Sequence, residues 1–76
     1  MNKEIEIRMI MAKVESQIIT EGLLLNFIKI DEGLVEFDLK RINHCCMVDI
    51  KGIINYIKKA FILEIDWIKN VEVSYS

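Results

Sequence analysis

The only histidine and both cysteines of this 76-residue chain lie side by side in Asn43-His44-Cys45-Cys46. Thiolate sulfur and imidazole nitrogen are ligands for iron and other transition metals. The cluster lies where an alternating, strand-like pattern changes to a helical one, and the positive N-terminal end of a helix favours the thiolate form of a nearby cysteine. A metal or redox function would therefore lie here. The competing interpretation is that both cysteines are buried as small hydrophobic residues.

Length and composition indicate a single ordered domain. The chain is 53% hydrophobic, with three glycines and no proline, which argues against disorder and favours a compact fold or an oligomer that shares its core. The chain has ten basic and twelve acidic residues, which gives a net charge of −2. Because nucleic-acid binding normally needs a basic surplus, we expect no nucleic-acid partner. We expect a homo-oligomer or another protein as partner.

The expected cellular compartment follows from the sequence patterns for membrane spans, signal peptides and disulfides. No apolar run approaches the length of a membrane span, and Met1-Asn2-Lys3-Glu4 is not followed by the core of a signal peptide. Adjacent cysteines rarely bridge each other, because the linking peptide would be strained. We therefore expect a cytoplasmic protein with reduced thiols and no membrane contact.

The first part of the chain predicts a helix with two apolar faces. Within residues 2–19, one stripe at helical spacing consists of Ile7, Ile10, Met11, Val14 and Ile18, and a second of Ile5, Met9, Ala12 and Ile19. We expect one stripe to face the core and the other to form an interface. The alternation in residues 4–8 also fits a strand, but the later spacing favours a helix. Gly22 follows as the expected helix stop.

Alternation then predicts two strands, residues 24–30 and 34–39, joined by the Asp31-Glu32-Gly33 turn with a positive φ at Gly33. A second helix follows over residues 50–61, with Lys58 and Lys59 near its C-terminal end, and a third strand over residues 67–75 begins at Trp67, a core or rim aromatic residue. The predicted class is α+β in the order α-β-β-α-β. Charges on one strand face indicate that helices cover only the other face of the three-stranded sheet.

This pattern resembles the C-terminal domain of NifU-type iron–sulfur cluster assembly proteins over residues 1–76. The stretch 31–39 is similar to that family's hairpin and second strand, and Gly52-Ile53-Ile54 and 64–71 are similar to its second helix and closing strand. In this register Asn43 and Cys46 fall at the two positions of the family's Cys-x-x-Cys motif. Shifting the register by two residues puts Cys45 at the first position and Val48 or Asp49 at the second, so either register leaves one cysteine.

The resemblance implies a non-enzymatic protein that assists iron–sulfur cluster assembly or carries iron at an altered, incomplete site. In the family, thiolates from two protomers hold a labile cluster. Cys46 is then the principal cofactor and metal ligand, Cys45 the second thiolate candidate, and His44 a further metal ligand. Two ligands from each subunit of a homodimer would supply the four that a cluster takes.

Other functions have weaker support in the sequence. No nucleophile elbow or phosphate-binding glycine loop is present, and adjacent cysteines suit a thiol redox enzyme poorly. RNA-binding KH domains share the element order, but their Gly-x-x-Gly loop is absent. The main alternative is a small homodimeric protein-interaction module that keeps the fold without a metal site and uses the second stripe of the first helix.

Overall fold

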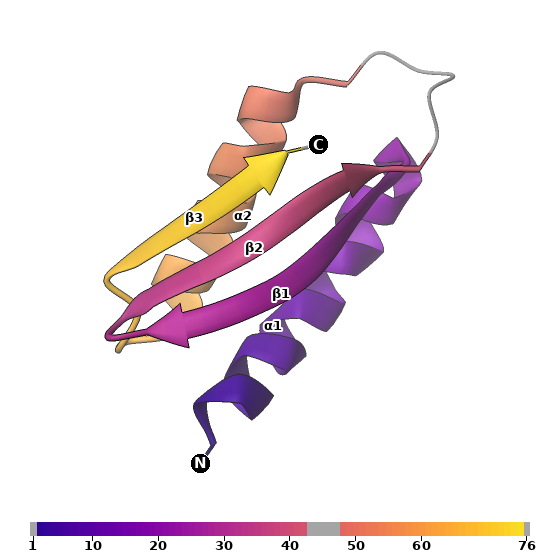
Figure 1. Ribbon diagram of the computed structural model, residues 1–76. Coiled ribbons are helices and arrows are strands. Elements are labelled where there is room, and N and C mark those ends of the chain that lie inside the picture. The colour runs from indigo at the N-terminus through magenta and orange to yellow at the C-terminus, as the bar shows by residue number, and fades with distance from the viewer. Residues whose placement is uncertain (1, 43–47, 76) are drawn as a thin grey trace.

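The chain forms two long helices and three strands in the predicted order, α-β-β-α-β (Figure 1). The computed structural model describes residues 2–42 and 48–75, and residues 1, 43–47 and 76 lie outside the description. The elements are α1 (Lys3–Ile18), a short 3-10 helix η1 (Ile19–Glu21), β1 (Leu23–Asp31), β2 (Leu34–Arg41), α2 (Ile50–Glu64) and β3 (Asn70–Tyr75). The strands form one mixed sheet in the order β1-β2-β3, and both helices cover the same face (Figure 1). The α+β class and the one-sided helical layer are therefore confirmed.

Helix α1 begins at a side-chain cap and buries one of its two apolar faces. The Asn2 Oδ1 atom accepts a hydrogen bond from the Glu4 backbone N–H at 2.8 Å, which satisfies a donor that the helix itself leaves free. The buried residues are Ile7, Met11, Val14 and Ile18. The second apolar stripe is exposed, with Ile5 at 52% and Met9 at 58%. The strand alternative for residues 4–8 is therefore wrong, because the helical spacing buries four apolar side chains together.

Both predicted glycine signals lie at chain reversals. Gly22, with φ of 75°, ends η1 in the left-handed conformation, and its N–H donates to the Ile19 carbonyl at 3.0 Å. Glu32 and Gly33 form the two-residue loop between β1 and β2, with φ of 47° and 88°. Positive φ at both loop residues is the type I′ pattern, whose twist matches that of antiparallel strands. The predicted hairpin is confirmed.

Strand β3 pairs with β2 in parallel, from Leu34 opposite Asn70 to Leu39 opposite Tyr75. A parallel pair needs a long crossover, which α2 supplies. The strand begins at Asn70, later than the predicted start at Trp67, which lies in the turn after α2. The sequence placed Lys58 and Lys59 near the C-terminal end of the second helix. Helix α2 instead continues to Glu64, so both lysines lie within it and outside its last turn.

The core lies between the sheet and the two helices, and every described helix and strand except η1 contributes to it. Val35, Phe37 and Leu39 of β2 are fully buried, as their alternation predicts. Phe37 packs against Phe61 of α2 with ring centroids 4.6 Å apart. The buried set is Ile7, Met11, Val14, Ile18, Leu23, Leu25, Val35, Phe37, Leu39, Ile57, Phe61, Ile65, Ile68 and Val71. Among the described residues, no charged or polar side chain is buried with it.

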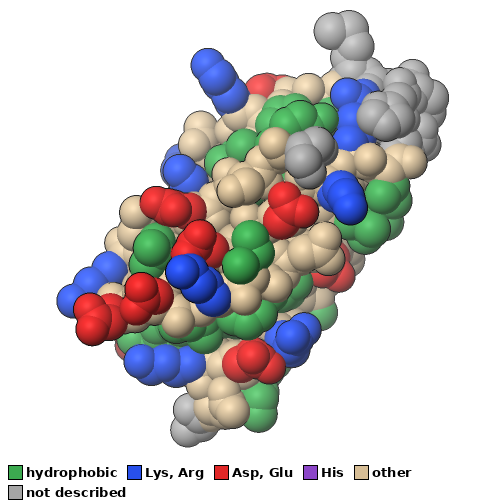
Figure 2. Space-filling view, viewed as in Figure 1, with side chains coloured by type: hydrophobic (Ala, Val, Ile, Leu, Met, Phe, Trp, Pro, Cys, Tyr) green, Lys and Arg blue, Asp and Glu red, His purple; other side chains and the backbone are tan. Residues whose placement is uncertain are grey.

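The opposite face of the sheet carries acidic and basic side chains intermixed (Figure 2). Glu36 and Asp38 alternate with the buried residues of β2, and Lys29 Nζ of β1 lies 3.4 Å from Glu36 Oε2. Mixed charge on a sheet face is typical of a solvated surface. Within residues 2–42 and 48–75, no helix is long and apolar enough to cross a membrane.

Candidate functional site

The expected ligands His44, Cys45 and Cys46, together with Asn43, lie in the segment 43–47, outside the described residues. We call these five residues the cysteine segment. What the structure describes is its two flanks, the end of β2 on one side and the start of α2 on the other.

The strand-side flank lies at the surface, next to the end of the first helix. The Ile42 N–H donates to the Gly22 carbonyl at 2.8 Å, so the chain leaves β2 beside the glycine that ends η1. Ile42 itself is 51% exposed. On its strand side the cysteine segment thus follows a solvent-facing residue, whereas Val48, which follows the segment, is half-buried and packs against the core.

The helix-side flank is a capped N-terminus. Asp49 is the N-cap of α2, and its Oδ1 accepts the Gly52 N–H at 3.1 Å. A Cβ on Gly52 would lie 2.6 Å from Asp49 Oδ2, so the glycine makes room for the capping carboxylate. Within the helix, the first turn contains no acidic side chain. The partial positive charge of the remaining free N–H groups therefore favours an anion in front of α2, although Asp49 already offsets part of that charge.

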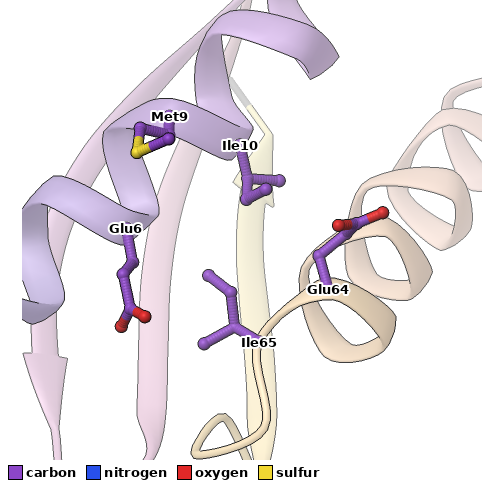
Figure 3. A pocket seen from close by; sticks show the side chains of 5 residues that line it. All are labelled: Glu6, Met9, Ile10, Glu64 and Ile65. Atoms are coloured by element: carbon purple, nitrogen blue, oxygen red, sulfur yellow. The ribbon is translucent and has the colours of Figure 1, made fainter.

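A depression of about 230 Å³ opens between α1 and the end of α2 (Figure 3). Met9 and Ile10 of α1 and Ile65 after α2 form its apolar lining, and the carboxylates of Glu6 and Glu64 point in opposite directions in this view. Ligand pockets usually measure about 300–1,000 Å³ and bring polar groups together. The depression is smaller, and its two carboxylates diverge, so it does not resemble a substrate pocket.

The structure contains a side-chain hydrogen bond that the sequence did not predict, between two residues 61 positions apart in the chain. The Trp67 Nε1–H donates to Glu6 Oε2 at 2.6 Å, and Lys3 Nζ lies 4.9 Å from the centroid of the indole ring. Trp67 is partly buried at the edge of the core, which agrees with the prediction of a core or rim aromatic residue. Its partner was not predictable, because it depends on how the start of α1 meets the turn after α2.

Apart from the cysteine segment and the two terminal residues, the chain contains no group of three or more histidine, cysteine, aspartate or glutamate side chains that could hold a metal ion. Comparison with known proteins found no match among family models, curated proteins or solved structures.

Proposed function

We propose that this protein assists iron–sulfur cluster assembly or carries iron, without enzymatic activity, and that Cys46 is its principal thiolate ligand. Cys45 and His44 would supply further ligands, since thiolate and imidazole both bind iron. The observation that carries the proposal is that these three residues lie in the chain between the end of β2 and the start of α2. By the resemblance to NifU-type domains, the Cys-x-x-Cys motif of that family lies between the corresponding strand and helix.

The electrostatics of the helix-side flank support this proposal. A ligand thiolate carries negative charge, and the N-terminal end of α2 carries partial positive charge without an acidic side chain in its first helical turn. Such a position lowers the cost of keeping a cysteine ionised. Asp49 at the N-cap reduces this benefit without removing it, because one carboxylate satisfies only part of the free N–H groups.

The exposure of the flanks is a second support. A thiol that accepts and releases iron must be reached by solvent, and Ile42 and Asp49 lie at the surface, whereas Val48 between the cysteine segment and Asp49 is half-buried against the core.

The alternative is a homodimeric protein-interaction module that keeps the fold without a metal site. It is favoured by the exposed apolar stripe of α1, in which Ile5 and Met9 are more than half exposed. Thiol accessibility separates the two candidates. Rapid labelling of the folded protein by a thiol reagent supports iron handling, whereas thiols that react only after unfolding support the interaction module.

The deciding experiment is anaerobic reconstitution with iron and sulfide, followed by visible absorption, iron analysis and native mass spectrometry. We expect the wild type to bind iron in stoichiometric amounts, Cys46→Ser to lose most of it, and a chelator to remove it from the wild type. Cys45→Ser, the matched substitution at the neighbouring position, should lower the occupancy less. No colour and no added mass in the wild type would reject the metal proposal and leave the interaction module.

A further inference from the structure

The exposed face of α1 has the spacing of a coiled-coil seam. Its members are separated by four, three, four and three residues, which is the a/d pattern of a heptad repeat. All lie on the helix surface opposite the buried stripe, as a rotation of about 100° per residue requires. We call this set the outer seam, and it consists of Ile5, Met9, Ala12, Ser16 and Ile19.

The outer seam pairs large with small side chains when a second copy of α1 is laid against it in the antiparallel direction. In the register that places Met9 opposite Ala12 of the second copy, Ile5 lies opposite Ser16. Antiparallel coiled coils pair an a position with a d position in this way. Large residues facing small ones let two helices approach closely without voids or overlap. Four of the five seam positions are thus complementary to each other in one register, and Ile19, which lies in η1 directly after α1, comes opposite Asn2.

The charges beside the outer seam match in the same register. On one flank, Glu6, whose Oε2 also accepts the Trp67 Nε1–H, comes nearest to Lys13 of the second copy. On the other flank, Arg8, whose Nε lies 3.4 Å from Glu4 Oε2 of its own helix, comes nearest to Glu15. A two-fold axis repeats each pair, so four contacts of opposite charge border the seam. The parallel arrangement would not form these four pairs. Opposite charges beside a coiled-coil seam set the choice and orientation of the partner.

We propose that a second copy of this chain covers the outer seam and forms an antiparallel, two-fold symmetric α1–α1 dimer. The occupant is a second copy because the size pattern and the charge pattern are both self-complementary in a single register. No other protein has to be invoked for these residues.

The expected contact is of modest size. One helix pair of about four turns falls at the low end of specific interfaces, below about 1,200 Å² in total, so we expect micromolar and not nanomolar dissociation. The dimer also leaves the two copies of Ile42, the strand-side flank of the cysteine segment, far apart. Ile42 bonds to Gly22 beyond the C-terminal end of α1, and antiparallel pairing puts these ends on opposite sides. The proposal of the dimer and the proposal of the metal site can therefore be tested, and rejected, independently of each other.

Sedimentation velocity over a concentration series, in the presence of reductant, tests the dimer. We expect reversible dimerisation of the wild type and a dissociation constant raised about 100-fold or more by Met9→Glu, which puts two carboxylates into the apolar seam. Ile28→Glu is the matched control, because Ile28 is 51% exposed and lies on β1, away from the seam. A wild type that stays monomeric at millimolar concentration would overturn the proposal, as would equal effects of the two variants.

A charge-exchange cycle tests the register. Arg8→Glu and Glu15→Arg should each weaken the dimer by about 3- to 10-fold, because like charges then face each other across the two-fold axis. The double variant should return to within about twofold of the wild type. Lys51→Glu, an exposed charge reversal on α2, should leave dimerisation unchanged. Additive losses in the double variant would overturn the antiparallel register.

The orientation has its own readout. A spin label on Thr20→Cys, in a chain with Cys45→Ser and Cys46→Ser, should give a label separation of roughly 30 Å in the antiparallel dimer, given a rise of 1.5 Å per residue. A separation near 10 Å would show parallel helices and reject the proposal. Iron reconstitution of Met9→Glu should match that of the wild type, which keeps the test of the dimer separate from the test of the metal site.

Discussion

Gly33 contributes to the pairing of β2 with both of its neighbouring strands, β1 and β3. Its φ of 88° closes the hairpin to β1, and its carbonyl accepts hydrogen bonds from the N–H groups of Lys69 and Asn70 at 2.8 and 3.2 Å, where β3 begins. A Cβ at this position would lie 3.1 Å from Lys69 Cγ and 3.3 Å from the Trp67 carbonyl oxygen. Backbone conformation and close packing therefore both select glycine.

Gly33→Ala should lower the free energy of unfolding by about 1–2 kcal/mol, because a left-handed conformation with a Cβ is strained and the neighbouring chain must shift. Urea denaturation followed by circular dichroism measures this loss. Glu32→Ala is the control within the same turn, since Glu32 already has a Cβ at a φ of 47°, and its effect should stay within about 0.5 kcal/mol. Equal stability of Gly33→Ala and wild type would show that the turn relaxes without cost.

Sequence predictions for single residues were confirmed where the local backbone conformation favours one residue type. Gly33 adopts the positive φ expected of it, and Gly22 ends the first helical segment as expected, in a left-handed conformation that glycine takes without a Cβ penalty. The ligand roles of Cys45 and Cys46 stay a prediction, since these residues lie outside the described part of the chain. Adjacent side chains usually point in different directions, so spacing alone does not decide whether two sulfurs can reach one iron.

At the scale of elements, the start of α2 combines a cap with a glycine that makes room for it. The Asp49 carboxylate accepts the Gly52 N–H and lies where a Cβ of residue 52 would be. Alanine normally stabilises a helix relative to glycine by up to about 1 kcal/mol. Here that gain is opposed by the 2.6 Å approach to Asp49 Oδ2. The two residues should therefore be energetically coupled.

A double-mutant cycle on Asp49 and Gly52 tests this coupling by chemical denaturation. Asp49→Ala should cost about 1 kcal/mol through loss of the cap. Gly52→Ala should be neutral or destabilising in the wild type but stabilising by about 0.5–1 kcal/mol in the Asp49→Ala background. If Gly52→Ala had the same effect in both backgrounds, the capping carboxylate would not be what excludes a side chain at position 52.

The sequence predicted the elements better than their pairing. The alternation of Val35, Phe37 and Leu39 identified the buried face of β2 because side chains in a strand alternate with a period of two. The parallel pairing of β3 with β2 was not predicted. It depends on how far α2 runs back along the sheet and on the turn at Trp67, neither of which is encoded in local periodicity. This is also why β3 begins at Asn70 and not at Trp67.

At the scale of the whole molecule, a small core coexists with a large exposed apolar surface. In the described part of the chain, fourteen hydrophobic side chains are buried, whereas Ile5, Met9 and Leu63 are 52%, 58% and 82% exposed. A domain of this size is only marginally stable on its own, so association that covers apolar surface contributes directly to folding stability. The outer seam of α1, which the proposed dimer would cover, is part of this exposed apolar surface.

The melting temperature should therefore depend on protein concentration. For a dimer with micromolar dissociation, raising the concentration 100-fold should raise the melting temperature of the wild type by about 5 °C or more, because mass action favours the folded dimer over unfolded chains. Differential scanning calorimetry in reductant measures this shift. The melting temperature of Met9→Glu should not change with concentration, whereas that of Ile28→Glu should change as in the wild type. The double variant Cys45→Ser/Cys46→Ser should keep the wild-type dependence, since the helix pair does not use the thiols. Loss of the dependence in that variant would instead assign association to the cysteine segment.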